Sequence, residues 1–229
     1  MTTKARHAAW RCCVLAATLG IPGWAQAQVG GSLVLVSDHR FRGVSLSNER
    51  PDLQITLSYD HPGGAYAGAS VGGVEFEGSQ RLTRLLAYAG LSHPLGDTLR
   101  WDIGTSFSHA PGDARYDYGE AYAGLIAQHW RLYANLSPDY FGSGARTAYV
   151  GLDAGWPLAG DGHLLVHLGV LRRLDSPSGG RADARFGVGW AVAGGDLQLA
   201  WVGVQRGGPF AAAYDQRRSA LVLSASYAF

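Results

Sequence analysis

The chain has 229 residues, with 19 Lys and Arg against 18 Asp and Glu, so its formal net charge is only +1. That balance excludes a strongly basic protein that binds nucleic acid through phosphate contacts. Glycine occurs 33 times, about twice its usual share of roughly 7%. Because each interior glycine costs a helix about 0.5–1 kcal/mol relative to alanine, the composition disfavours helices and favours a β-protein.

The first 27 residues have the form of an export signal. A basic start precedes a short apolar run at 12–21, and Ala25-Gln26-Ala27 supplies the small-x-small site that signal peptidase accepts. The run is too short for a permanent transmembrane helix, which needs about 20 apolar residues. We therefore expect a cleaved signal peptide at 1–27 and a single domain at 28–229. The signal contains both cysteines and three basic residues, so the mature chain has 16 basic and 18 acidic residues, a net charge of −2.

Twelve segments of the mature chain alternate between apolar and polar residues, as strands with one apolar face do. In chain order the expected strands are 32–38, 52–61, 65–76, 81–93, 98–109, 116–128, 131–137, 147–157, 163–173, 181–192, 196–205 and 219–229. Short turns such as Pro62-Gly63-Gly64 alternate with longer polar links such as 40–51 and 206–218. Short turns at one rim and longer loops at the other are typical of outer-membrane proteins. The sequence therefore predicts an all-β fold, a transmembrane up-and-down antiparallel β-barrel of about 12 strands.

The last expected strand shows the two faces clearly. One face carries Leu221, Leu223, Tyr227 and Phe229, whereas the other holds small residues, serines and Val222. A strand between lipid and a polar lumen needs this pattern. The terminal aromatic face of Tyr227 and Phe229 also resembles the signal by which the barrel assembly machinery of the outer membrane recognises its substrates. We therefore expect that machinery as a partner.

Large aromatic residues gather at one expected rim. Tyr59, Trp156 and Trp190 lie on apolar faces beside short turns, and Phe229 ends the chain at the same rim. A soluble β-sandwich also alternates, but its large aromatics would gather near the middle of the strands, in the core. A belt at the rim is typical of a membrane interface, so it favours the barrel over the sandwich.

Ionisable residues recur on the polar faces of the expected strands. If those faces point inward, the predicted pore-lining residues are Asp60, Arg84, Arg100, Asp102, Glu120, Arg131, Asp153, His167, Asp183 and Arg185. Charges of both signs on neighbouring strands suit a narrow pore that sorts small hydrated solutes by size and charge. They equally suit a network of ion pairs that plugs the interior, and the sequence leaves both readings open.

One segment resembles a known family. Ser37-Asp38-His39-Arg40-Phe41-Arg42-Gly43-Val44-Ser45-Leu46-Ser47 is similar to the opening signature of the TorF-type porin family of exported Gram-negative proteins, and segments 64–70, 118–124 and 136–141 are weaker matches. The resemblance covers essentially the whole mature chain, although His39 stands where the family has Tyr. It implies an outer-membrane β-barrel with a porin role.

The motif residues Arg40, Phe41 and Arg42, with Asp38, fall where the first expected strand meets its loop. Guanidinium groups bind carboxylates and phosphates, so the patch suits a constriction that contacts anions. It also suits a structural latch, in which the arginines pair with loop acids or lipopolysaccharide phosphates while Phe41 packs at the rim.

The predicted function is an outer-membrane channel for passive diffusion of small hydrophilic solutes in a Gram-negative bacterium. The alternatives are a plugged structural or adhesive barrel, and a lipid-modifying enzyme. Ser106, Ser108, His109 and Asp113 would supply catalytic groups near the outer rim, but no nucleophile-elbow or metal-ligand spacing accompanies them, so we expect no enzyme. Expected partners are membrane lipid, lipopolysaccharide and small solutes, with no nucleic acid and no cofactor or metal.

Overall fold

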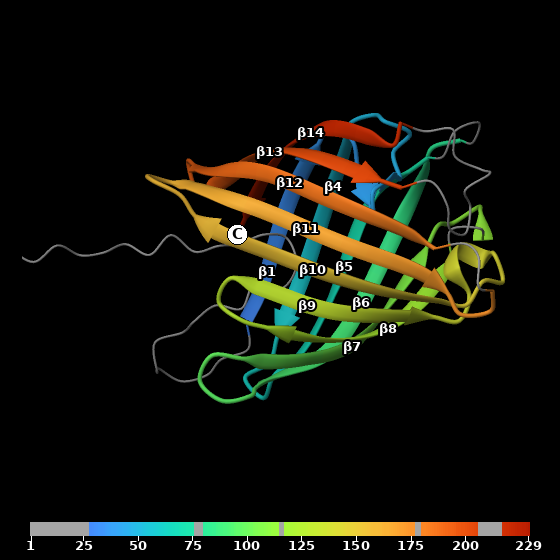
Figure 1. Ribbon diagram of the computed structural model, residues 1–229, viewed down its shortest axis with the longest axis horizontal. Helices are drawn as coiled ribbons and strands as arrows, with labels where there is room; N and C mark the ends of the chain where they lie inside the picture. Colours follow the sequence, from blue (N-terminus) through green and yellow to red (C-terminus); the bar gives the residue numbers. More distant parts are fainter. Residues whose placement is uncertain (1–27, 76–79, 115–116, 177–179, 206–216) are drawn as a thin grey trace, which may run out of the picture.

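The computed structural model describes residues 28–75, 80–114, 117–176, 180–205 and 217–229, so the expected signal peptide at 1–27 lies outside the described residues. Twelve antiparallel strands form a closed barrel, in the order β1-β14-β13-β12-β11-β10-β9-β8-β7-β6-β5-β4 (Figure 1). They are β1 (Gln28–Val36), β4 (Asp52–Asp60), β5 (Ala65–Val74), β6 (Leu82–Pro94), β7 (Arg100–His109), β8 (Tyr118–Ile126), β9 (Trp130–Ser137), β10 (Thr147–Pro157), β11 (Gly162–Arg173), β12 (Arg181–Val192), β13 (Gly195–Val204) and β14 (Ser219–Ala228). The predicted fold class and the strand number are confirmed.

Among the described residues, three short elements are not part of the barrel wall. Strands β2 (Arg40–Phe41) and β3 (Val44–Ser45) form a two-stranded sheet in the link that joins β1 to β4 along the chain. A 3₁₀ helix, η2 (Tyr140–Gly142), lies in the link between β9 and β10. No helix in the part of the chain that the structure describes is long and apolar enough to cross a membrane.

Side chains alternate between the outside and the inside of the barrel, as the sequence pattern predicts. On β14, Leu223 is 51% exposed and Phe229, just beyond the strand, 63%, whereas Val222 is 6% exposed. The aromatic residues of the predicted rim belt, Tyr59, Trp156 and Trp190, are also exposed. The outward face is therefore apolar over most of its height, as a surface in contact with lipid requires.

Short turns and long links separate to opposite ends of the barrel. The short turns lie with the C-terminus at the left of Figure 1, and the longer links lie at the right. The turn between β12 and β13 is the tightest: Ala193 and Gly194 both have positive φ, 50° and 83°. A two-residue turn with two positive φ angles matches the twist of the strands that it joins.

The barrel closes where the first strand meets the last. Strand β1 pairs with both β14 and β4, and Gly31 exchanges two backbone hydrogen bonds with Phe229, at 2.8 and 2.9 Å. The Phe229 ring lies over Gly31, so closely that a β-carbon on Gly31 would come within 2.6 Å of it. Strand β1 begins four residues earlier than predicted, because Gly30 and Gly31 have no side chains to show the alternation.

Glycines and tyrosines face each other across neighbouring strands on the inner surface. A β-carbon on any of these glycines would collide with the ring or hydroxyl of the facing tyrosine. The pairs are Gly68 with Tyr88, Gly90 with Tyr66, Gly104 with Tyr122, Gly151 with Tyr133 and Gly169 with Tyr149. The glycine excess noted in the composition therefore has a structural use: it makes room for inward-facing rings on the wall from β5 to β11.

Candidate functional site

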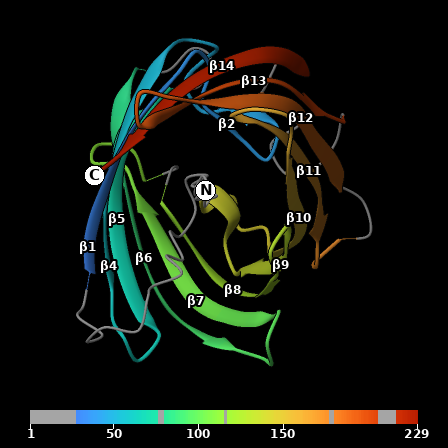
Figure 2. The same ribbon diagram turned by 90° about the vertical axis from the view of Figure 1, so that its left-hand side faces the viewer.

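A hairpin occupies the lumen at the long-loop end. Strands β2 and β3 lie inside the ring of barrel strands, as the view along the barrel shows (Figure 2). Between them, Arg42 and Gly43 form a two-residue turn with positive φ angles of 49° and 78°. We call residues 37–50 the inner hairpin. It contains the motif that resembles the TorF-type signature.

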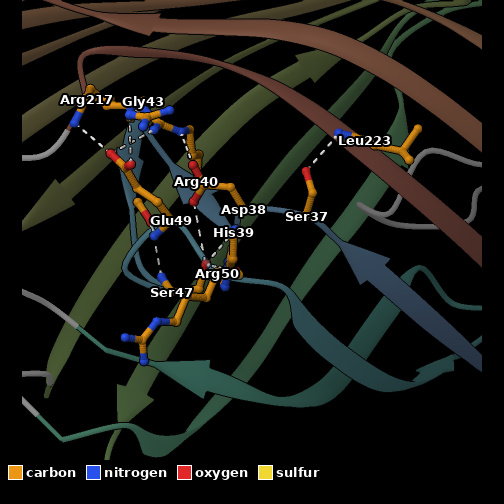
Figure 3. Close-up of polar contacts among 11 residues, drawn as sticks. Ser37, Asp38, His39, Arg40, Gly43, Ser47, Glu49, Arg50, Arg217 and Leu223 are labelled. Atoms are coloured by element: carbon orange, nitrogen blue, oxygen red, sulfur yellow. Dashed lines mark hydrogen bonds and ion pairs between the residues drawn. The ribbon is translucent and has the colours of Figure 1, made fainter.

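Polar contacts hold the base of the inner hairpin to the wall (Figure 3). The Ser37 amide donates to the Leu223 carbonyl at 2.8 Å, and the Leu223 amide donates to Ser37 Oγ at 3.0 Å. Ser37 thereby extends the pairing of β1 with β14 by one residue. Arg40 donates from Nε to Asp38 Oδ2 at 2.6 Å and from Nη1 to the carbonyls of Gly43 and Arg217. These contacts fix the direction in which the hairpin enters the lumen.

The tip of the inner hairpin places Arg42 in a buried site. Its guanidinium donates to both carboxylate oxygens of Glu120, at 2.7 and 2.9 Å, and Asn135 donates to the same carboxylate at 3.1 Å. Arg42 Cζ lies 4.1 Å from the ring centre of Tyr149 and 5.6 Å from that of Tyr140. Bidentate pairing and stacking on rings are the two contacts for which guanidinium is best suited. We call Glu120, Asn135, Tyr140 and Tyr149 the Arg42 site.

Arg42 is a cation in this setting. Burial alone would lower the pKa of its guanidinium, but the Glu120 carboxylate and the neighbouring tyrosines raise that pKa above its ordinary value. The ion pair is almost completely buried, with side chains only 5% and 4% exposed. Removing either partner would leave an uncompensated charge in the lumen.

Further carboxylates of the wall face basic residues of the hairpin. Arg50 pairs with Glu75 at 3.0 Å, and His39 Nδ1 lies 3.2 Å from Asp52 Oδ2. The Glu75 amide also donates to the Leu46 carbonyl at 2.7 Å. The hairpin is therefore tied to β4 and β5 on one side and to β8 on another.

An apolar cluster completes the closure of this end. It joins the inner hairpin, η2 and the wall, and consists of Leu46, Val74, Ala110, Tyr118, Tyr140, Phe141, Tyr149 and Leu171, with Phe41, Leu82 and Tyr133 packed against it. The Phe41 ring lies 6.2 Å from that of Phe141 and 6.4 Å from that of Tyr118. Phe41 thus packs inside the barrel, not at the rim where the latch hypothesis put it.

Nearer the short-turn end, the inward face is polar and its charges are linked by hydrogen bonds. Asp102 accepts from the Tyr66 hydroxyl at 2.5 Å and from Arg131 at 3.3 Å, and the hydroxyls of Tyr66 and Tyr122 are 2.6 Å apart. The network crosses β5, β7, β8 and β9. The carboxylate of Asp102 is thus neutralised by Arg131 and held in place by the Tyr66 hydroxyl.

A second network surrounds His167 on β11. Its Nδ1 lies 2.7 Å from Asp153, and its Nε2 lies 2.9 Å from Asp183 and 2.8 Å from the Tyr149 hydroxyl. The side chain of Asp153 points inward but is 44% exposed. Water therefore reaches the inner wall at this level, below the closed end.

The ten predicted pore-lining residues all lie in barrel strands on the inward face. The structure brings together Asp102 with Arg131, and Asp153 and Asp183 with His167. Four others have separate partners. These contacts are Glu120 with Arg42, Arg84 with the Ser108 hydroxyl, Arg100 with the Ser92 carbonyl and Arg185 with Gln198. Within the described ranges Asp60 has no ion pair. A role in lining a conducting pore stays a prediction.

The catalytic groups considered from the sequence are not brought together. Ser106 and Ser108 point inward, whereas His109 is on the exposed face of β7 and pairs with Asp117 at 2.9 Å. Among the residues with described positions, no group of three or more His, Cys, Asp or Glu could hold a metal ion.

Sequence reasoning missed that the first long link folds into the lumen. It therefore missed Asp52, Glu75 and Tyr149 as contacts of the motif. A signal was present: Arg42-Gly43 stands between two apolar residues, and two-residue turns with glycine in such a setting are hairpin turns.

The family profile described as "Bacterial protein of unknown function (Gcw_chp)" matches residues 24–224. The chain belongs to the Gcw_chp family. The resemblance to the TorF-type family is not confirmed under that name. A search of curated proteins gives no match for this Gcw_chp protein.

Solved structures resemble the fold of this Gcw_chp protein. The KdgM porin superposes with a TM-score of 0.55 at 9% identity, covering 89% of this chain and 99% of that one. The NanC porin superposes with a TM-score of 0.51 at 10% identity, covering 88% of this chain and 98% of that one. At identities this low, the superpositions show a shared fold and no more. That fold is the barrel of outer-membrane porins.

Proposed function

We propose that this Gcw_chp protein is an outer-membrane channel for passive diffusion of small hydrophilic solutes, closed at its outer end by the inner hairpin in the conformation described above. The similarity of its fold to the KdgM and NanC porins supports a porin-like role. The apolar outer face with its aromatic belt supports a place in the membrane, with the long-loop end outside the cell.

The observation that carries the proposal is the solvent exposure of a charged side chain on the inner wall. The inward-facing Asp153 is 44% exposed although the barrel around it is closed. A barrel filled by its own side chains would leave that carboxylate little exposed, whereas here it stays open to solvent although it pairs with His167. The lumen below the hairpin therefore suits hydrated solutes.

The inner hairpin can leave the lumen without breaking the wall. Strands β1 and β4 pair directly with each other from Gln28 and Asp60 to Val36 and Asp52, and the hairpin is an excursion between them. Opening would cost the contacts of the hairpin but no hydrogen bond between these two strands. This is the arrangement that a gated channel needs.

A permanently plugged structural barrel is the second candidate, and the apolar cluster favours it. Tyr140, Tyr149 and Leu171 are at most 1% exposed, and an inner hairpin packed against such a cluster has reason to stay in place. The two candidates differ in whether the hairpin moves, which an experiment can test.

A reversible cross-link would hold the inner hairpin in place. Ser47 and Glu75 are partners in an isolated parallel bridge, so cysteines at both positions fall within the usual range for a disulfide. The natural cysteines, Cys12 and Cys13, lie in the expected signal peptide. We expect Ser47→Cys/Glu75→Cys to be silent in a planar bilayer when oxidised and to conduct after reduction, with Ser47→Cys alone as the control.

Each outcome of that measurement distinguishes the candidates. Conductance that appears only after reduction supports a channel gated by the hairpin. Equal conductance in both redox states would remove the hairpin from the solute path. Silence of the wild type, the control and the reduced variant would favour the plugged barrel over the channel.

A further inference from the structure

We propose that the Arg42 site is a cation-binding site of the open channel, and that Arg42 is a tethered competitor for the organic cations that pass through it. The inference rests on the proposed function as a channel. It adds a substrate class, solutes that carry a guanidinium or ammonium group, and a reason why such solutes would open the gate.

The Arg42 site has the chemistry of a receptor for a guanidinium group. The Glu120 carboxylate offers two acceptors in one plane, and the Tyr149 ring offers a face 4.1 Å from the cation. A carboxylate with an aromatic face recognises a cation through charge, direction and stacking together. The wall supplies all of these groups, from β8 and β10, so they stay behind when the hairpin leaves.

The charges are divided unequally between the inner hairpin and the wall. The hairpin neutralises its own acids: Asp38 pairs with Arg40 at 2.6 Å, and Glu49 lies 3.8 Å from the same guanidinium. Its Arg42 and Arg50, in contrast, neutralise acids of the wall. When the hairpin swings out it therefore removes positive charge from the lumen and exposes negative charge.

The wall beside the hairpin is acidic on balance. Four buried carboxylates belong to it, those of Asp52, Glu75, Glu120 and Asp183. Three arginines of the wall face them, the buried Arg84 and Arg181 and the more exposed Arg81, which pairs with Asp52 at 2.6 Å. An excess of carboxylates in a narrow lumen favours cations over anions.

Asp183 adds an independent sign of an unfilled cation contact. It lies beside the hairpin tip, where a β-carbon on Gly43 would come within 3.0 Å of the Asp183 Cβ. Its side chain is 2% exposed, and its Oδ2 atom is buried without a hydrogen-bond partner among the described residues. A buried carboxylate oxygen without a donor is costly and suits a transient cationic partner.

Two matched variants separate the gate from the binding site. Arg42→Ala and Glu120→Gln both break the same ion pair, so both should raise the conductance of the wild type in a planar bilayer. Only Arg42→Ala keeps the carboxylate. In a KCl gradient its ratio of potassium to chloride permeability should exceed that of Glu120→Gln by more than about fivefold, because one unit charge at about 4 Å in water changes the energy of each ion by about 1 kcal/mol, in opposite directions for potassium and chloride.

A second measurement reports on the binding site even if no variant conducts. Amide exchange of the inner hairpin in the refolded protein should accelerate when guanidinium chloride is added at non-denaturing concentration. Urea, a neutral molecule of similar shape, should have no such effect at the same concentration. Glu120→Gln should abolish the difference between guanidinium and urea.

The outcomes keep the two proposals distinct. Silence of every variant in the bilayer would refute the channel, and the exchange experiment would still decide whether the site binds cations. Conduction with equal selectivity in Arg42→Ala and Glu120→Gln would refute the cation site but leave the channel intact. An equal response to guanidinium and urea would also refute the cation site.

Discussion

Removing the guanidinium of Arg42 should release the inner hairpin locally while the barrel stays folded. The ion pair with Glu120 is bidentate, with distances of 2.7 and 2.9 Å, and both side chains are about 95% buried. Loss of one partner of such a pair typically costs about 3–5 kcal/mol, because the remaining charge is left without compensation. The hairpin can avoid part of this cost by undocking, since water then reaches Glu120. We therefore expect Arg42→Ala to shift the docking equilibrium toward the open form.

The expected size of that shift can be measured by amide exchange. At 1.4 kcal/mol per factor of ten, a shift of about 3–5 kcal/mol in the docking equilibrium corresponds to roughly a hundredfold to a few thousandfold faster exchange of amides that are protected only while the hairpin is docked. The amide that reports it is that of Glu75, which donates from the wall to the Leu46 carbonyl of the hairpin at 2.7 Å. The amides of strand β14 should keep their protection, because no wall pairing is lost.

Arg50→Ala is the matched control, because it also removes an arginine that pairs the hairpin with a wall carboxylate. The Arg50 side chain is 64% exposed, and exposed pairs contribute about 1 kcal/mol or less, or less than about tenfold in exchange. If Arg42→Ala accelerates exchange no more than Arg50→Ala does, Arg42 is not what holds the hairpin in the lumen. If β14 loses protection as well, the change is global and the idea of a separately docked hairpin is wrong.

Two further predictions concern the wall. Gly104→Ala should destabilise the refolded barrel by about 1–3 kcal/mol in urea titration, because its β-carbon would come within 2.6 Å of the Tyr122 ring and hydroxyl. Gly119→Ala is the control: its nearest contact would be at 3.7 Å, so it should change stability far less. Equal effects of the two variants would contradict the packing argument. Deletion of Phe229 should reduce the amount of folded protein in the outer membrane much more than it changes the conductance of the protein that does insert. The reason is that it removes the contacts of the last residue with Gly31, where the barrel closes. Normal insertion of the deletion variant would refute this.

The barrel could be predicted from the sequence because the pattern that specifies each strand lies within that strand. Each strand needs only the alternation of outward apolar and inward polar residues, and Leu221, Leu223 and Phe229 showed it without knowledge of any partner. Strand β1 was predicted four residues short because Gly30 and Gly31 carry no side chain. Their place in the strand follows from pairing with β4, which is a long-range property.

The closed end was harder to predict because its contacts join distant parts of the chain. Nothing near Arg42 in the sequence identifies Glu120 or Tyr149 as its neighbours, since 78 residues separate the ion pair. The charges could be listed but not paired. The inward-facing residues were therefore found from their alternation, whereas the way in which the motif closes the lumen was not.

The facing glycines and tyrosines of the inner wall impose a constraint on how the sequence can change. Gly151 can gain a side chain only if Tyr133 loses its ring, and Gly169 and Tyr149 are bound in the same way. Each such pair should therefore vary together across the Gcw_chp family, with a small residue on one strand wherever the other has a ring. Tyr149 also faces Arg42, so a change at Gly169 in β11 would reach the hairpin tip without touching it. A substitution at Gly169, a wall position that does not contact the hairpin, would in this way change how readily the barrel opens.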